Sequence, residues 1–372
     1  MNKIKMSVFS FITVSILITV IIFPKEILES SKNGLILWYK NVIPSLFVFM
    51  TGVSILSLTG FSKTFGKLFK NIMTPLFSVS KECAFPWIMG LISGSPTSAK
   101  IIADLYKEGI ISRKDAQRTL SFSSNASPLF ITGTVATSML GFYMAGYFIM
   151  FIVIISSIST GFVFKFIDIK ETNKKTSILK NRENKYYTVG EILKKSIYSS
   201  SETIIMIGGF IVLFSVIICT LEIWGIFSNI SNLIYNITGI SNEYSKGIIS
   251  GIMEMTCGCN ILSQCNIDLF SKIVGIVLVI SFSGISINLQ TISVFSNTDL
   301  SPFIYIISKI LNTVFALIYT VLFYGLLEKH IQKTVPTVFI QGTDNISILC
   351  IVFSYLVVIM SFINCIYFKI KK

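Results

Sequence analysis

The sequence predicts an all-α polytopic membrane protein whose two inverted repeats contain interrupted or re-entrant helices, with about eight net crossings. Composition is the first reason, because 52% of the residues are hydrophobic and only 13% are charged, a balance typical of membrane proteins. Apolar runs of about 20 residues, long enough to span a bilayer as helices, are the second. Two short motifs that each occur twice are the third, since they indicate internal duplication.

The excess of basic residues indicates which segments between the spans face the cytoplasm. The chain carries 31 Lys and Arg against 18 Asp and Glu, but the basic residues lie between the apolar runs instead of forming a separate basic patch. We therefore expect no nucleic-acid partner. Segment 165–195 has nine Lys or Arg and four acids, which predicts a cytoplasmic location for it.

The first apolar run, 8–23, predicts an uncleaved span. It follows a basic start, as in a signal peptide, but no small-residue cleavage site precedes Lys25. Further spans are predicted wherever a run is long enough to cross at about 1.5 Å per residue: 36–58, 144–166, 203–221, 302–326 and 346–368. Hydropathy alone does not resolve the composite regions between them, 83–140 and 241–299, or decide whether 83–98 and 247–262 re-enter or cross.

Two motifs and the segments before them predict the repeats. Gly90-Leu-Ile-Ser-Gly94 recurs 157 residues later as Gly247-Ile-Ile-Ser-Gly251, and the Ser-Phe-Ser of 121–123 recurs 160 residues later at 281–283. An amphipathic segment precedes each Gly-rich copy, with lysines on the polar face of 61–77 and asparagines on that of 222–237. Only a cytoplasmic interfacial helix is biased toward lysine, so we expect the repeats to be inverted.

The predicted organisation follows from these repeats. Inverted repeats with interrupted segments are typical of secondary transporters. When the predicted crossings are counted from the cytoplasmic segment 165–195, both termini are expected in the cytoplasm. The parts are a first span with an external link (1–33), a first inverted repeat (34–167), a basic cytoplasmic loop (168–200), a second inverted repeat (201–328) and a last span with a basic tail (329–372).

Two polar stretches interrupt apolar sequence at 120–130, LSFSSNASPLF, and at 280–290, ISFSGISINLQ. Unpaired backbone at membrane depth is tolerated only where protein or a wet cavity satisfies it, so these breaks predict a lined pathway. The alternative is that the small polar residues only join helices. The candidate pathway-lining residues are Ser123, Asn125, Ser127, Ser283, Ser286, Asn288 and Gln290.

The Gly-rich motifs predict hairpins. Paired small residues allow helices to approach closely, and a proline then ends the helix. The hairpin residues are Gly90, Gly94, Pro96, Gly247, Gly251 and Gly258. After the first hairpin, Ser112 with Asp115 forms a capping-box pattern. The charged residues around it are expected to form a solvated cytoplasmic face: Asp104, Lys107, Glu108, Arg113, Lys114 and Arg118.

Glu254 is the most informative acid, because apolar or small residues flank it on both sides. An ionisable residue in such a segment is costly and is a functional candidate by default. Thr256 and Asn260 could supply neutral ligands beside it. The alternative is that Glu254 caps a helix or reaches interfacial water.

No metal site, cofactor or enzymatic activity is expected. Cys257, Cys259 and Cys265 fit no strong zinc pattern, and His330 is remote in the sequence. The chain contains no Ser/His/Asp set, no His-Glu pair at helical spacing and no nucleotide loop. We therefore predict no catalytic residues.

Three stretches resemble the YlbJ family of sporulation integral membrane proteins: residues 90–135, beginning GLISGSPTSAK and ending SFSSNASPLFITGTV, residues 251–259, GIMEMTCGC, and residues 281–293, SFSGISINLQTIS. The first departs from the family pattern at Ser124, where asparagine is expected. The resemblance implies a multi-pass protein of an endospore-forming bacterium that is needed for spore cortex formation. It also implies repeats similar to the Gate domain of nucleoside transporter-like proteins.

Two functions remain open. The first is a transporter or permease of a small polar solute in the membrane of the sporulating mother cell or forespore, working by alternating access between the repeats. The second is a non-transporting scaffold or assembly factor for cortex synthesis. Such a scaffold would recruit other sporulation membrane proteins through 165–195 and the helical pair 99–120.

Overall fold

The structure is a computed structural model that describes residues 3–59, 69, 71–167, 169 and 187–333. Within these residues every regular element is a helix, which confirms the all-α class. Four helical segments are long and apolar enough to cross a membrane, Tyr143–Phe164, Val189–Ile223, Leu269–Phe295 and Pro302–Gly325. They contain most of the predicted spans 144–166, 203–221 and 302–326, whereas the predicted span 346–368 lies outside the described residues.

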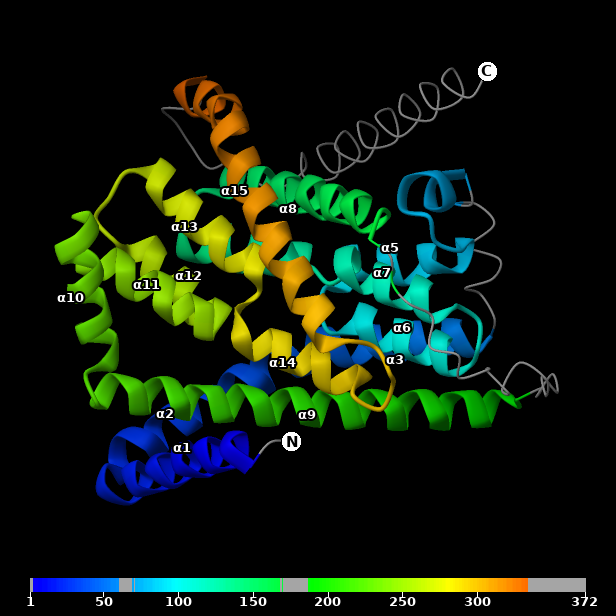
Figure 1. The fold of residues 1–372 in the computed structure, drawn as a ribbon, viewed down its shortest axis with the longest axis horizontal. Helices are drawn as coiled ribbons and strands as arrows, with labels where there is room; N and C mark the ends of the chain where they lie inside the picture. The colour runs from blue at the N-terminus through cyan, green and yellow to red at the C-terminus, as the bar shows by residue number, and fades with distance from the viewer. Residues whose placement is uncertain (1–2, 60–68, 70, 168, 170–186, 334–372) are drawn as a thin grey trace.

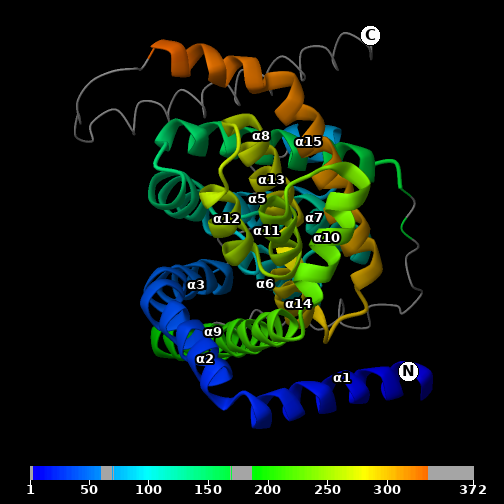
Figure 2. The ribbon, with the colours of Figure 1, turned by 90° about the vertical axis from the view of Figure 1, so that its left-hand side faces the viewer.

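Two of the N-terminal helices, which lie within residues 24–58, pack along one long helix. The N-terminal elements are α1 (Lys3–Ile22), α2 (Pro24–Leu37), the π-helical η1 (Trp38–Val42) and α3 (Ile43–Leu58), and α2 and α3 lie beside α9 (Val189–Ile223) (Figures 1 and 2). Trp38 donates its indole N–H to Ile204 O at 3.0 Å. The Trp38 ring lies against Gly208, and a Cβ atom added to Gly208 would come within 2.8 Å of that ring. The predicted runs 8–23 and 36–58 are therefore helical, but neither is among the four long apolar segments.

The first Gly-rich motif forms a helix–break–helix unit followed by a broken helix. Its elements are η2 (Lys81–Cys83), α5 (Ala84–Ser93), α6 (Thr97–Lys107), α7 (Arg113–Ser123), the π-helical η3 (Phe130–Met139) and α8 (Tyr143–Phe164). Ser112 caps α7, because its side chain accepts the N–H of Asp115 at 3.0 Å. This confirms the helix start predicted there.

The second Gly-rich motif lies within α11 (Asn242–Met253), and the helices around it repeat the same order of elements. These are α10 (Ile226–Thr238), α11, α12 (Met255–Gln264), α13 (Leu269–Phe282), α14 (Gly284–Phe295) and α15 (Pro302–Lys333). The amphipathic segment 222–237 is divided between α9, which ends at Ile223, and α10, which begins at Ile226, because Gly225 between them has a left-handed φ of 68°. Most of its counterpart, 61–77, lies outside the described residues.

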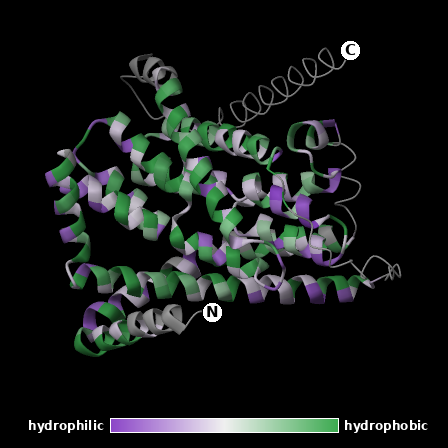
Figure 3. Ribbon diagram, viewed as in Figure 1, coloured by the Kyte–Doolittle hydropathy of each residue, from purple (hydrophilic) through white to green (hydrophobic). Residues whose placement is uncertain are grey.

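Helix α15 crosses the molecule between the two groups of short helices (Figure 1). Helices α5, α6 and α7 lie on one side of it and α10, α11 and α12 on the other, and the residues of α8, α13 and most of α15 are strongly hydrophobic (Figure 3). One apolar core surrounds the first group, where the rings of Phe77 and Phe122 stack with centroids 4.2 Å apart. The second core joins α8, α12, α13 and α15.

The prediction that Arg118 belongs to a solvated face of 99–120 is wrong. Its side chain is only 5% exposed and donates to Ser78 O, Lys165 O and Ile167 O at 3.0, 2.6 and 3.1 Å. Lys165 caps the C-terminus of α8, where carbonyls lack helical partners. Arg118 is buried because a guanidinium can donate to several such carbonyls at once.

Candidate functional site

The first hairpin break lies directly against the first helix break. The break between α5 and α6 contains Gly94, and the break between α7 and η3 contains Asn125. The N–H of Ser95 donates to Asn125 O at 2.8 Å. A Cβ on Gly90 would overlap Ser123 O, and a Cβ on Gly94 would come within 2.8 Å of Ser127 N. Glycine at 90 and 94 is thus what lets the two breaks meet.

The second half contains an equivalent contact. Helices α11 and α12 are separated by Glu254, and α13 and α14 by Ser283, which has a left-handed φ of 69°. A Cβ on Gly284 would come within 3.1 Å of both Gly251 O and Met255 N. A Cβ on Gly258 would overlap Gly251, so these glycines also set the close packing of α11 and α12.

One face of α15 joins both helix breaks. Lys309 Nζ donates to Ser124 O in the first break. Tyr305 donates its hydroxyl to Asn288 Oδ1 at 3.1 Å in α14, and Asn312 Nδ2 donates to Ser281 O at 3.3 Å near the end of α13. The three α15 side chains are at most 2% exposed and lie at helical spacing. They therefore form a buried polar stripe through the centre of the fold.

Most of the predicted pathway-lining residues of 120–130 and 280–290 are buried in these breaks or in the helices beside them. Asn125 Nδ2 donates to Phe122 O at 3.0 Å, and Asn288 Nδ2 donates to Phe282 O at 2.9 Å, so each amide satisfies a carbonyl at the end of a broken helix. Gln290 Nε2 donates to Ser286 Oγ at 3.2 Å. Ser127 is partly exposed, whereas exposure is 4% or less for Ser123, Asn125, Ser283, Ser286, Asn288 and Gln290.

Sequence reasoning missed the α15 stripe. Lys309 was detectable, because it is an ionisable residue inside an apolar run, the same signal that selected Glu254. Tyr305 and Asn312 gave no comparable signal, since neither carries a charge that would be costly in a membrane segment.

Glu254 caps a helix in this structure. Its Oε2 accepts the N–H of Cys257 at 2.8 Å at the start of α12. Asn260 is exposed on the same helix, where its Oδ1 accepts from Gln264 Nε2 at 3.3 Å, and Thr256 is partly exposed. These three residues belong to the α11–α12 hairpin, whereas the serine and asparagine candidates lie in or beside the broken helices that α15 bridges.

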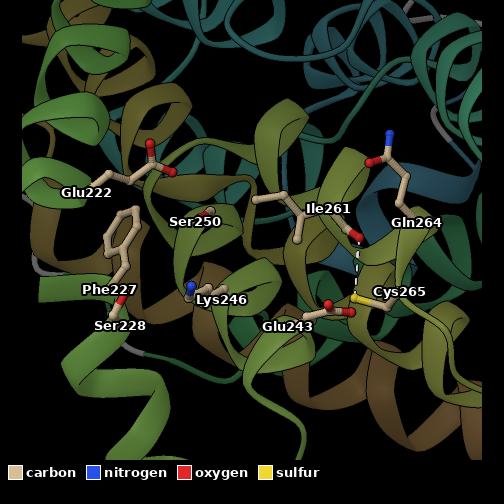
Figure 4. A pocket seen from close by; sticks show the side chains of 9 residues that line it. All are labelled: Glu222, Phe227, Ser228, Glu243, Lys246, Ser250, Ile261, Gln264 and Cys265. Atoms are coloured by element: carbon tan, nitrogen blue, oxygen red, sulfur yellow. Dashed lines mark hydrogen bonds between the residues drawn. The ribbon is translucent and has the colours of Figure 1, made fainter. Parts of the chain in front are cut away.

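A pocket of about 530 Å³ opens beside that hairpin (Figure 4). The pocket lies close to the Glu254 break along the chain. The N–H of Glu254 donates to the backbone oxygen of Ser250, a residue that lines the pocket, at 2.7 Å. Burial, and then the Glu243 carboxylate, raise the pKa of the Cys265 thiol, which stays protonated at neutral pH. The lining residues are Glu222, Phe227, Ser228, Glu243, Lys246, Ser250, Ile261, Gln264 and Cys265.

No metal centre accompanies this pocket in the part of the chain that the structure describes. No group of three or more His, Cys, Asp or Glu residues there could hold an ion. Cys259 and Cys265 are buried and Cys257 is exposed, and all three are free thiols. The residues predicted to line the pathway lie outside the pocket.

The chain is similar to known proteins. The chain is 28% identical to the sporulation integral membrane protein YlbJ of Bacillus subtilis (strain 168), over 95% of this chain and 94% of that protein. This confirms the resemblance to YlbJ. Residues 39–159, which include the first pair of breaks, match the Gate family, described as nucleoside recognition. Together with the long apolar helices, these matches identify a multi-pass integral membrane protein.

A solved structure of a CNTnw variant in an outward-facing state is also similar. It is 12% identical, with a TM-score of 0.44, over 86% of this chain and 85% of that one. A TM-score this low does not establish a shared fold.

Proposed function

We propose that the protein is a transporter of a small polar solute that acts during sporulation and supports spore cortex formation. The observation that carries this proposal is the meeting of two pairs of interrupted helices on the polar face of α15. Interrupted helices expose backbone groups that membrane transporters use to bind solutes and ions near the midplane. The sporulation role rests on the similarity to YlbJ.

The proposed topology is a pair of inverted repeats, with about eight crossings and both termini in the cytoplasm. The repeated order of helix–break–helix, broken helix and long helix supports duplication. In the proposed cycle the breaks are closed here, because Ser123, Asn125 and Asn288 are buried. Alternating access would then open them toward one side of the membrane at a time.

A nucleoside is the first solute to test, since the Gate family is described as nucleoside recognition. Its sugar hydroxyls and base edges are donors and acceptors that the serine hydroxyls and asparagine amides of the breaks could match. The proposed binding set is Ser123, Asn125, Ser127, Ser283, Ser286, Asn288 and Gln290, with Glu254, Thr256 and Asn260 at the hairpin.

The scaffold alternative receives less support from the geometry. The last eight residues of α7 are all buried, so that helix does not offer a free docking face. Most of the other proposed docking segment, 165–195, lies outside the described residues. Deleting 170–186 would test it directly, because a scaffold should lose its cortex role while a transporter retains solute uptake.

Uptake of radiolabelled uridine and adenosine into vesicles containing the purified full chain tests the proposal. We expect uptake by the wild-type protein and a reduction of about tenfold for Asn288→Ala, the loss expected when about 1.4 kcal/mol of binding is removed. Asn229→Ala, at an exposed position of α10, is the matched control. Uptake unaffected by Asn288→Ala at equal protein abundance would exclude the breaks as the pathway. Absence of binding and uptake for polar solutes of every class supplied to correctly folded protein would exclude transport.

A further inference from the structure

Lys309 is a buried cation inside a helical segment that is long and apolar enough to cross a membrane. It lies within Pro302–Gly325, is 2% exposed and donates from Nζ to the backbone carbonyl of Ser124. Among the described residues, Lys309 takes part in neither of the ion pairs Lys100–Asp104 and Arg113–Asp299, and its Nζ is held by a backbone carbonyl instead of a carboxylate. A charge held this way in a membrane segment is costly and indicates a function.

The atoms around the ammonium resemble a site for a small cation. Ser124 is the C-terminal cap of α7, with a non-helical ψ of 84°, so its carbonyl lies at the negative end of a helix that stops inside the protein. The Ser124 hydroxyl lies 3.4 Å from the Ser98 hydroxyl, which adds neutral oxygens beside that carbonyl. Unwound carbonyls and half-helix C-termini are the groups that coordinate Na⁺ or receive H⁺ in transporters with broken helices.

We propose that the Lys309 ammonium takes the place of a bound metal cation in the first helix break, so that the proposed transport is coupled to protons and not to sodium. This inference rests on the proposed transport function. While protonated, Lys309 holds α15 to the end of α7 through a charge-assisted hydrogen bond. Nζ takes one proton from water on the side of the membrane where protons are more abundant, and gives one proton to a water molecule after the break opens to the side where protons are scarcer. The neutral amine then loses its charge-assisted hold on Ser124 O until it is protonated again.

The other ionisable groups described on the helices packed against α15 have separate partners or lie far along the helix from Ser124. On α7, Arg113 pairs with Asp299 and Arg118 donates to three carbonyls elsewhere. Lys114 and Asp115 lie in the first turn of α7, more than two helical turns from Ser124. On α13, Lys272 Nζ donates to Ser263 O at 2.9 Å. Helix α8 has no acidic or basic residue, and on α15 itself Tyr305 donates to Asn288.

Thermal unfolding of the purified full chain in detergent tests the cation site without knowledge of the solute. The melting temperature is compared in NaCl, ammonium chloride and choline chloride at equal ionic strength. For the wild type we expect no sodium-specific shift, because the ammonium already fills the site. For Lys309→Ala we expect a lower melting temperature in choline and a recovery of about 2 °C or more in ammonium or sodium, since a ligand that binds only the folded state stabilises it.

Lys272→Ala is the matched control, because Lys272 also donates to a backbone carbonyl but is partly exposed. It should show no cation-specific recovery. A sodium-specific rise in the wild type would overturn the proposal, as would equal melting of Lys309→Ala in all three salts. If Lys309→Ala does not accumulate, the wild-type comparison decides the sodium question alone, and Lys309→Ser supplies a smaller hydroxyl-bearing variant for the rescue. The uptake assay with nucleosides is independent, so failure here leaves the transport proposal standing.

Discussion

Arg113 and Asp299 form an ion pair that ties the first group of helices to the loop between α14 and α15. Arg113 Nε lies 3.0 Å from Asp299 Oδ2, and the same guanidinium donates to Asp299 O. Tyr106 of α6 donates to Asp299 Oδ1 at 2.6 Å. Gln117 exchanges two hydrogen bonds with the backbone of Ser301 at 2.6 and 3.2 Å. The start of α15, and with it the polar stripe, is therefore positioned by α6 and α7.

Asp299→Asn should loosen this connection. The side chains of the pair are 17% and 33% exposed, so we expect a loss of about 1 kcal/mol of unfolding free energy, at the upper end for partly exposed pairs. Thermal unfolding in detergent measures the loss. The control is Asp104→Asn, which removes the Lys100–Asp104 pair within a single helix and should cost less than about 0.5 kcal/mol. Equal losses for the two variants would contradict a role for Asp299 in joining the helix groups.

Gly90→Ala should be strongly destabilising. A Cβ at this position would overlap the carbonyl oxygen of Ser123 and come within 2.9 Å of Ser98 Cβ, and backbone cannot move aside cheaply. We expect a loss of about 2 to 4 kcal/mol in thermal unfolding. Gly209→Ala is the control, because nothing lies within 4 Å of a Cβ there and alanine favours a helix by about 0.5 to 1 kcal/mol. Similar stability for the two variants would show that α5 and α7 do not pack this closely.

The sequence could predict what local patterns determine. Hydropathy located three of the long apolar segments, and the Ser112 cap followed from its spacing to Asp115. The partners of Arg118 could not be predicted, because Ser78 and Lys165 are distant in the sequence and converge only in the fold. A charged side chain in a polar stretch was therefore expected to face solvent.

The candidate site shows the same limit. The Ser-Phe-Ser repeats and paired glycines marked where the helices break, since Gly, Pro, Ser and Asn interrupt an apolar run visibly. That one face of α15 meets both breaks depends on contacts over long sequence separations, such as Lys309 with Ser124. Periodicity along one helix cannot reveal which distant carbonyl its polar side chain will meet.

Replacing Arg118 tests how much its hydrogen bonds to three backbone carbonyls stabilise the fold. Arg118→Ala leaves the carbonyls of Ser78, Lys165 and Ile167 without their donor, and we expect a loss of about 3 kcal/mol or more in unfolding free energy. Arg118→Lys should recover only part of it, because an ammonium lacks the planar fork that reaches several acceptors. Lys114→Ala, on the same helix, should change stability by less than about 0.5 kcal/mol. A loss for Arg118→Ala no larger than that of Lys114→Ala would place Arg118 at the surface.

Glu254→Asn separates capping from a role in the proposed pathway. Asparagine is as good an N-cap as a carboxylate, so this variant should keep normal abundance and stability, whereas Glu254→Ala should lose about 1 kcal/mol through the missing bond to Cys257 N. If the carboxylate also binds solute or a proton, Glu254→Asn should lose spore heat resistance and cortex in a sporulating host that depends on this chain. The measurement is cortex content at matched membrane levels of the two proteins. Normal cortex with Glu254→Asn would mean that Glu254 only starts α12, and the functional charge of the membrane segments would then be Lys309.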